Sequence, residues 1–203
     1  MDNLTMLTSD QIAILQQQGN TADDWSLVKI THATDLSLLR GNHFAGSVEI
    51  GILRAEQSYT RCGLTVPEGI TNSWICNCTI GDHCAIHRVA YMANYEVQSN
   101  VLLFNIGRLI ALLPLHFDPI EVMNENGGRA IRPFVGMTIG DAFLWAKYRD
   151  RQRMLDRFEQ MALQATSERA FIGTFATIIN CQSICNVVVM STEQTPTTIT
   201  DAT

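Results

Sequence analysis

The stretch Ile172-Gly-Thr-Phe-Ala-Thr-Ile178-Ile-Asn-Cys-Gln-Ser-Ile184-Cys-Asn-Val-Val-Val decides the fold class of this chain. Isoleucine recurs every six residues, and Met190 falls on the next position of the same period. This period differs from the 3.6-residue period of an amphipathic helix. It is typical of a parallel β-helix of hexapeptide repeats, in which each hexad forms one short strand and a corner. We therefore expect the isoleucines to point inward.

Earlier in the chain the same period is carried by four residues, Trp74, Ile80, Ile86 and Met92. The period then slips by one residue, because it continues at Val97 and Leu103. We interpret the slip as a one-residue deletion at a corner. Together these segments predict a mainly β fold, a parallel β-helix whose successive coils stack as parallel strands.

The sequence pattern divides the chain into four parts. Residues 1–43 are expected to form an N-terminal helical cap that covers the end of the β-helix. Residues 44–136 form β-helix coils. Residues 137–166 hold a long α-helical excursion packed on the β-helix, helical from about residue 138 to 165 because apolar residues lie on one stripe there. Residues 167–203 continue the β-helix, and the lack of a capping helix after them predicts a truncated chain.

The composition is that of one globular chain with an acidic surface. The 203 residues are 46% hydrophobic and carry a formal net charge of −6, which argues against nucleic acid or an anionic membrane as a partner. The chain contains no run of 18 consecutive apolar residues, so no transmembrane helix is predicted, and the N-terminus lacks the pattern of a signal peptide. We therefore expect a cytoplasmic protein whose six cysteines are reduced thiols.

Six short segments carry a resemblance to a known family. They are 15–25 (LQQQGNTADDW), 44–48 (FAGSV), 77–82 (NCTIGD), 91–95 (YMANY), 124–129 (NENGGR) and 148–151 (YRDR). Together they resemble the N-terminal part of an uncharacterised bacterial family of long hexapeptide-repeat proteins, often labelled UDP-N-acetylglucosamine acyltransferases. The resemblance covers most of residues 8–190. It implies a left-handed β-helix, and it implies that members continue well past Thr203 with further coils.

The resemblance also makes the histidines of this chain candidates for a catalytic base. Hexapeptide-repeat acyltransferases use a histidine as general base on the acceptor hydroxyl or amine, in a cleft between the subunits of a trimer, and a near-neutral pKa suits this task. His87 is the candidate, because it follows the inward Ile86 and should point outward from its strand. The alternative is an ordinary surface histidine.

The loop Asn124-Glu-Asn-Gly-Gly-Arg129 is the most site-like loop of the chain. Its consecutive glycines can present backbone N–H groups to an anion, and Arg129 can add a fork for phosphate or carboxylate. We therefore take Glu125, Asn126 and Arg129, with Asn94, as candidate substrate-binding residues. The alternatives are a tight turn for the loop and a corner asparagine with a left-handed backbone for Asn94.

The cysteines predict no metal site. Zinc sites take four ligands at characteristic paired spacings that the six cysteines lack. Cys78 and Cys84 instead occupy positions where a small inward residue is expected, and free cysteine is commonly buried. We expect no bound cofactor, although an acyl-CoA or an acyl carrier would be the co-substrate of an acyltransferase.

Two classes of function remain open. The first is a hexapeptide-repeat acyltransferase-like protein that acts on or binds a nucleotide sugar or a similar metabolite. The second is a non-catalytic β-helix scaffold or oligomerisation module. In both cases we expect a homo-oligomer, a trimer by the habit of hexapeptide-repeat proteins, and no nucleic-acid or membrane partner.

Overall fold

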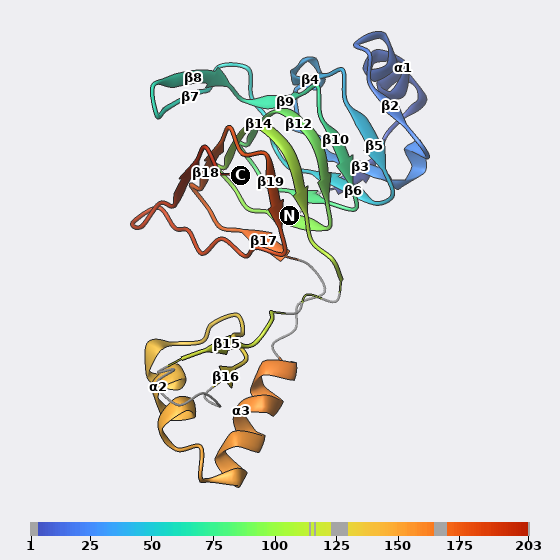
Figure 1. Cartoon of the computed structure of the whole chain (residues 1–203). Helices are drawn as coiled ribbons and strands as arrows, with labels where there is room; N and C mark the ends of the chain where they lie inside the picture. Colours follow the sequence, from blue (N-terminus) through green and yellow to red (C-terminus); the bar gives the residue numbers. More distant parts are fainter. Residues whose placement is uncertain (1–3, 114, 116, 123–129, 165–169, 203) are drawn as a thin grey trace. The chain divides into compact units, whose positions relative to one another are not determined.

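The chain forms two compact units, each with its own core. The computed structural model describes residues 4–113, 115, 117–122, 130–164 and 170–202. The strand-rich unit consists of residues 1–112 and 169–203, and the helical unit consists of residues 113–168. The fold is mainly β with parallel sheets, and the described residues include three α-helices (Figure 1).

Two parallel sheets build the strand-rich unit. The first has the strand order β1 (Leu4–Met6), β3 (Val28–Thr31), β6 (Val48–Ile50), β11 (Thr79–Ile80), β13 (Tyr95–Val97) and β17 (Ala170–Ile172). The second has the order β2 (Thr21–Ala22), β5 (His43–Ala45), β10 (Trp74–Cys76), β12 (Ala85–Ala93), β14 (Leu102–Ile110), β18 (Thr177–Ile179) and β20 (Thr198–Thr200). Three further strands belong to the second sheet: β9 (Gly69–Thr71) pairs with β12, β4 (Leu39–Arg40) pairs with β9, and β19 (Ser183–Cys185) pairs with β14. Among the described strands of these sheets, only β1 runs antiparallel to its neighbour.

The core consists of three columns of aliphatic residues that pair in register across neighbouring strands. One column is Ile50, Ile80, Val97 and Ile172; the second is Ile70, Ile86, Leu103 and Ile178; the third is Ile75, Met92, Leu109 and Ile184. All of these side chains are buried. The steps from Ile80 to Val97 and from Ile86 to Leu103 span the same length of chain, which is one residue less than three hexads. The isoleucines of the stretch 172–189 are therefore inward, as the sequence predicts.

From β9 to β14, each change of direction is made by a residue with a left-handed backbone. Residues with positive φ follow one another at intervals of five or six, at Asn72, Asn77, His83, Arg88, Asn94, Asn100 and Asn105. Five of these seven are asparagine, the residue besides glycine that tolerates this conformation best. Arg88 and Asn105 lie inside β12 and β14, so each long strand bends there: β12 pairs with β9 before the bend and with β10 after it. We call these residues corners.

Two residues that the sequence analysis placed inside the core lie outside it. Ile75 rather than Trp74 pairs with Met92, and Trp74 is 46% exposed. Val189 pairs with Ile172 and is buried, whereas Met190 is 65% exposed. The reason is that the intervals between corners are not all six, because those from Asn72 to Asn77, from His83 to Arg88 and from Asn100 to Asn105 are shorter by one residue. The slip that we attributed to a single deletion therefore recurs at several corners.

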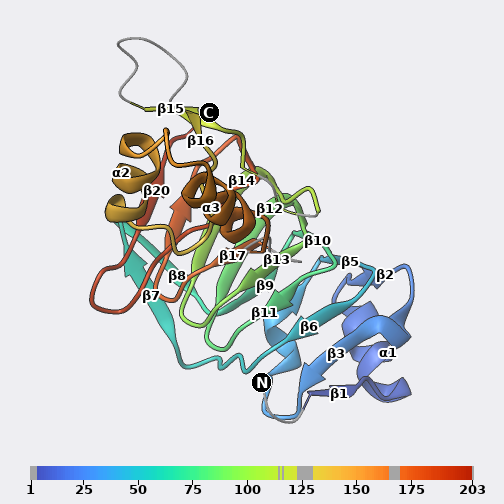
Figure 2. The same ribbon diagram turned by 90° about the horizontal axis from the view of Figure 1, so that it is seen from below.

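The first helix, α1 (Ser9–Gln17), begins at a complete capping box. The Thr8 hydroxyl accepts from the Gln11 backbone N–H, and the Gln11 side chain accepts from the Thr8 N–H, which satisfies two of the free donors at the helix start. Leu15 is the fully buried residue of the helix. Figures 1 and 2 both place α1 at the end of the stack where β2 and β3 lie. Two single turns follow it, at Trp25–Leu27 and Leu36–Leu38.

The helical unit has a small core of its own. It contains the antiparallel pair β15 (Ile120–Glu121) and β16 (Ala130–Ile131) and the helices α2 (Ile139–Lys147) and α3 (Gln152–Gln164). Trp145 of α2 stacks on Phe158 of α3 at a centroid distance of 5.2 Å. Both helices fall inside the range given for the helical excursion, and the break between them lies at residues 148–151. That the excursion packs on a β-helix stays a prediction.

Buried asparagines connect the first strands of the stack. The Asn42 amide donates to the Ile70 carbonyl at 2.7 Å and to the Asn20 Oδ1 at 3.0 Å, and its own oxygen accepts from the Ser73 N–H at 3.1 Å. Asn20 and Asn42 are each 1% exposed. Buried amides of this kind stabilise a fold only while every partner is satisfied.

We expect Asn42→Ala to lower the free energy of unfolding by about 2–4 kcal/mol, because it leaves the Ser73 N–H and the Ile70 carbonyl without their side-chain partner in a buried place. Urea denaturation followed by circular dichroism measures this loss. Gln17→Ala, at an exposed position of α1, is the matched control and should change stability by less than about 0.5 kcal/mol. Equal stabilities of the two variants would show that the asparagine contacts are dispensable.

Candidate functional site

A β-hairpin covers one outer face of the second sheet. Its strands β7 (Ser58–Arg61) and β8 (Leu64–Pro67) pair antiparallel, and we call residues 58–67 the arm. Tyr59 and Leu64 of the arm pack on a cluster of outward side chains from four strands, which comprises Val66, Ala85, Leu102 and Ile179. The arm therefore buries side chains that a bare sheet would present to water.

Arg61 fixes the arm across several strands. One guanidinium nitrogen donates to the Phe175 carbonyl at 3.0 Å and to the Thr177 hydroxyl at 3.0 Å, and the other donates to the Asn100 carbonyl at 3.1 Å. The guanidinium also lies over the Tyr59 ring, 5.0 Å from its centroid. Because three separate chain segments meet at this cation, the position of the arm is strongly determined.

His87, the predicted catalytic base, is buried beside the arm. Its side chain points outward from β12, as the sequence predicts, but the residue is only 6% exposed, so the alternative of an ordinary surface histidine is wrong. Nε2 lies 2.9 Å from the Pro67 carbonyl oxygen, and Nδ1 lies 2.8 Å from the Thr71 hydroxyl. Since a carbonyl oxygen only accepts, Nε2 carries the proton and Nδ1 accepts from Thr71. Burial lowers the pKa of the imidazole, although the bond to Pro67 opposes this shift.

A cavity of about 220 Å³ opens next to this histidine. Its walls are formed by η2 (Leu36–Leu38), β4, the end of β8, β9 and β12, through Ser37, Leu38, Arg40, Pro67, Glu68, Thr71 and His87. Arg40 donates from Nε to the Ser37 carbonyl at 2.7 Å. Gly69 packs closely against Leu38, because a Cβ at this position would come within 2.7 Å of the Leu38 carbonyl oxygen. Arg40 is the one cation among these lining residues.

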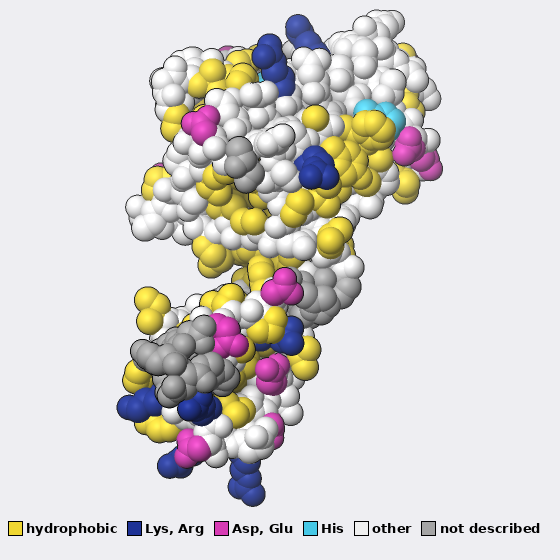
Figure 3. Space-filling model, in the orientation of Figure 1, with side chains coloured by type: hydrophobic (Ala, Val, Ile, Leu, Met, Phe, Trp, Pro, Cys, Tyr) yellow, Lys and Arg dark blue, Asp and Glu magenta, His cyan; other side chains and the backbone are white. Residues whose placement is uncertain are grey.

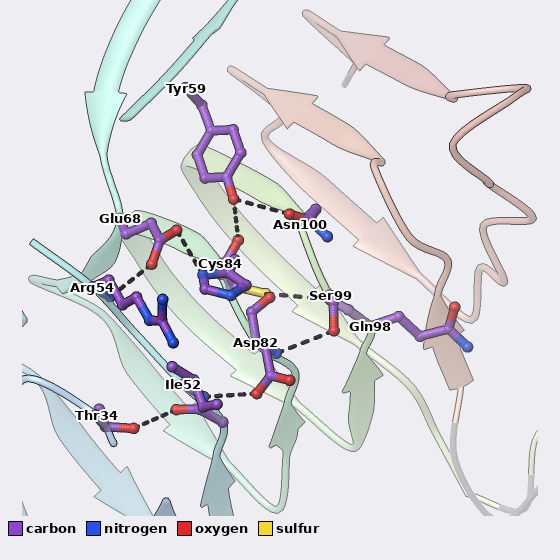
Figure 4. A network of polar contacts seen from close by, with 12 residues as sticks. Thr34, Ile52, Arg54, Tyr59, Glu68, Asp82, Cys84, Gln98, Ser99 and Asn100 are labelled. Atoms are coloured by element: carbon purple, nitrogen blue, oxygen red, sulfur yellow. Dashed lines mark hydrogen bonds and ion pairs between the residues drawn. The ribbon is translucent and has the colours of Figure 1, made fainter. Parts of the chain in front are cut away.

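A buried carboxylate lies where the arm returns to the sheet. The Glu68 side chain has no exposed surface; one oxygen lies 3.0 Å from His83 Nδ1, and the other accepts from the Arg54 backbone N–H at 2.8 Å. Figure 4 shows Glu68, Tyr59 and Asn100 converging on the segment at Cys84. The buried charge is thus paired with a histidine that is 26% exposed, and it ties the arm to the corner at His83.

Tyr59 completes this network from the arm. Its hydroxyl donates to the His83 carbonyl at 2.5 Å, and Asn100 Oδ1 lies 3.3 Å from the same oxygen. Burial, with a further contribution from the Glu68 carboxylate, raises the pKa of the Tyr59 hydroxyl. Tyr59 therefore stays protonated at neutral pH and serves as a donor.

Asn94, another predicted site residue, does not line this cavity. The Asn94 side chain donates to the Ala111 carbonyl at 2.7 Å, and its backbone has φ 62°, which is the corner role given as its alternative. Glu125, Asn126 and Arg129 lie outside the described residues. Their roles in substrate binding stay predictions.

The cysteines are free thiols. All six are unpaired, and Cys78 and Cys84 are fully buried, where burial raises the pKa of each thiol to about 12. Within the described part of the chain, no group of three or more His, Cys, Asp or Glu side chains is arranged to hold a metal ion. Nor does that part contain a helix long and apolar enough to span a bilayer.

Sequence reasoning missed Glu68, Thr71 and Arg40 as neighbours of His87. The signal for Glu68 was present, because it stands between Pro67 and Gly69, at the end of an alternating apolar segment. The signal for the other two was not, since both come from separate strands that only the register of the sheet brings together.

Comparison with known proteins identifies the domain but not its activity. Residues 4–202 match the family model described as a domain of unknown function, DUF4954. A relative named "Uncharacterized protein" from Treponema pallidum (strain Nichols) is 38% identical over 200 residues, which cover 89% of this chain and 27% of the relative. This chain thus spans about a quarter of that relative's length. No solved structure matches this chain.

These findings correct the resemblance drawn from the sequence. The assignment to a hexapeptide-repeat family labelled as UDP-N-acetylglucosamine acyltransferases is wrong, because the matching family is described only as a domain of unknown function. Neither that description nor the name of the relative mentions a hexapeptide repeat or an acyltransferase.

We expect His87 to make the stability of the fold depend on pH. The pKa of His87 is lowered in the folded state, so below about pH 6.5 the unfolded chain binds more protons and the free energy of unfolding falls. This contribution is complete above pH 6.5 and is lost as the pH falls towards the lowered pKa. His87→Gln should remove this contribution. The difference in the free energy of unfolding between the unmodified chain and the variant, measured by urea titration, should therefore become smaller from pH 7.5 to pH 5.

His32→Gln is the matched control for this experiment, because His32 is exposed. It should leave the pH dependence unchanged. A constant difference between the unmodified chain and His87→Gln over the whole range would contradict the burial of a neutral imidazole.

We expect Glu68→Ala to lower the free energy of unfolding by about 2–3 kcal/mol, because it leaves the Arg54 backbone N–H without its acceptor and His83 Nδ1 without its partner. Chemical denaturation of the variant measures the loss, with the exposed Glu56→Ala as control. In the double variant Glu68→Ala/His83→Ala the loss should be smaller than the sum of the two single losses. If the losses of the two single variants were strictly additive, the interaction between these two side chains would be contradicted.

Proposed function

This chain belongs to the family DUF4954, and we propose that it serves as a non-catalytic β-helix scaffold. In this proposal the coils wind as a left-handed parallel β-helix, and the outer faces of the coils, rather than a reaction centre, carry the function. The acyltransferase reading of the sequence is the competing proposal. Three sets of observations favour the scaffold.

The three aliphatic columns support the β-helix. A chain that returns to the same face after every third corner, and that keeps each of three faces in register, has the repeat of a three-sided coil. The left-handed backbone recurs at 77, 83 and 88 and again at 94, 100 and 105, so three corners accompany each repeat. The left-handed winding in this proposal departs from the usual right-handed crossover between parallel strands.

The state of His87 is the single observation that carries the non-catalytic reading. A general base needs a lone pair directed at the proton that it removes. In this chain the Nδ1 lone pair accepts from Thr71, and Nε2 donates to Pro67, so both ring nitrogens are engaged inside the protein. The lowered pKa also reduces the basicity of the imidazole at neutral pH.

The size of the cavity favours the same reading. Pockets that bind drug-sized ligands have volumes of roughly 300–1,000 Å³. The cavity beside His87 measures about 220 Å³ and is lined in part by Leu38 and Pro67, so an acyl-CoA or a nucleotide sugar would find room for only part of its structure. A cavity of this size suits the packing defect left where the arm crosses the sheet.

A thermal-shift screen tests the proposal. We expect no shift of the melting temperature with acetyl-CoA, longer acyl-CoAs or UDP-N-acetylglucosamine. A ligand at 100 times its dissociation constant would add about 2.7 kcal/mol to the stability of the fold, which such a screen detects. His87→Gln and Arg40→Ala alter the cavity, and His32→Gln leaves it intact.

A shift with one of these compounds that disappears in His87→Gln and Arg40→Ala but persists in His32→Gln would contradict the scaffold proposal and favour the acyltransferase proposal. A shift that persists in all three variants would place a ligand elsewhere on the chain, and the scaffold proposal would also fall.

A further inference from the structure

A column of large polar and aromatic side chains runs up the outer face of the second sheet. Its members lie in register on successive strands from β5 to β14, in the order His43, Trp74, Tyr91 and Arg108. The neighbouring residues Phe44, Ile75, Met92 and Leu109 point into the core, so these four point outward. We call them the Trp74 column. In Figure 3, hydrophobic side chains gather on this face between a histidine and a basic side chain.

The rings of the column contact one another edge to face. The centroids of His43 and Trp74 are 4.5 Å apart, and those of Trp74 and Tyr91 are 5.9 Å apart. Trp74 nevertheless keeps 46% of its surface exposed. Trp, Tyr and Arg are the residue types most enriched among the energetic centres of protein interfaces, and here they occupy three consecutive strands.

The two ends of the column carry opposite charges. At the β2 end, Asp23 follows the strand, is two-thirds exposed, and lies 3.3 Å from His43 Nε2. At the β14 end, Arg108 is exposed and makes a long bond of 3.4 Å to the Ser183 hydroxyl. Four strand spacings, about 19 Å, separate the strands of Asp23 and Arg108. Trp74 lies on the middle strand of the five.

This arrangement is complementary to itself. We propose that the Trp74 column is the contact surface for a second copy of this chain, related by a two-fold axis that runs between the two faces parallel to β10. The axis reverses the order of the strands, so each Arg108 reaches the Asp23 of the other copy. Trp74 then meets Trp74, and Tyr91 lies over His43. A two-fold contact of this kind uses the same patch on both copies and closes as a dimer.

The residues next to the column allow the two faces to approach. The parallel column two residues further along is small on three strands, with Ala45, Cys76 and Ala93, and it continues at Ile110 on β14. Ala45 and Ala93 are already buried, so little bulk stands beside the rings on this side. The patch is compact, so we expect a dissociation constant in the micromolar range. The proposal rests on the scaffold function, since it gives one of the outer faces its partner.

Charge reversal tests the geometry with this chain in analytical ultracentrifugation. The unmodified chain should form a dimer. Asp23→Arg and Arg108→Glu should each be monomeric, with dimerisation weakened by at least about 30-fold, because like charges then face each other. An equimolar mixture of the two variants should form a mixed dimer, and the double variant Asp23→Arg/Arg108→Glu should dimerise with itself. Trp74→Ala should weaken dimerisation by about 30-fold or more.

Glu96→Arg is the matched control, because it makes a comparable change of charge at an exposed position on β13 in the other sheet. It should dimerise as the unmodified chain does. Circular dichroism confirms that each variant is folded.

An unmodified chain that stays monomeric at about 100 µM would overturn the proposal, and the column would then belong to another partner. A mixture without a mixed dimer, or equal effects of Glu96→Arg and Asp23→Arg, would overturn it too. Each of these results leaves the thermal-shift test of the scaffold untouched, so the two proposals fail separately.

Discussion

The left-handed backbone at the corners is the constraint on which the rest of the strand-rich unit depends. Most strands are only two to four residues long unless they bend, so the chain must change direction every five or six residues. Only glycine, and next to it asparagine, adopts the required conformation at small cost. The chain uses asparagine at most of these corners and gains side-chain bonds that glycine could not make, such as the bond from Asn94 to the Ala111 carbonyl. Corner and stack thus stabilise each other.

The aliphatic columns could be predicted from the sequence because they follow from a local repeat. Ile172, Ile178 and Ile184 are inward and pair with the strands expected to lie beside them. The exact inward residue could not be predicted where the interval between corners is shorter by one. At Trp74-Ile75 both residues are large and apolar, so hydrophobicity alone does not choose between them. The register of Ile75 with Met92 decides, and register is a property of the assembled sheet.

The surroundings of His87 show why the candidate site was harder to predict than the fold. The outward direction of its side chain follows from alternation with Ile86, and the structure agrees with that direction. Its burial depends on the arm, a segment about 20 residues earlier whose path over the sheet is fixed by Arg61. No periodicity records such a crossing. A polar residue on the outer face of a strand therefore remains ambiguous until the segments that cover the face are known.

The same reasoning separates the two outer faces of the second sheet. Where the arm crosses, outward residues such as Ala85 and Leu102 are buried, and the polar groups among them are satisfied inside the protein. Where no described segment of the strand-rich unit crosses, a tryptophan stays half exposed between a histidine and a tyrosine. Burying a tryptophan removes a large apolar area from water. At this strand, however, the core is filled by Ile75, and the larger Trp74 stays on the outer face. In the proposed dimer, a second copy of the chain covers this face as the arm covers the other, with the charges of Asp23 and Arg108 matched.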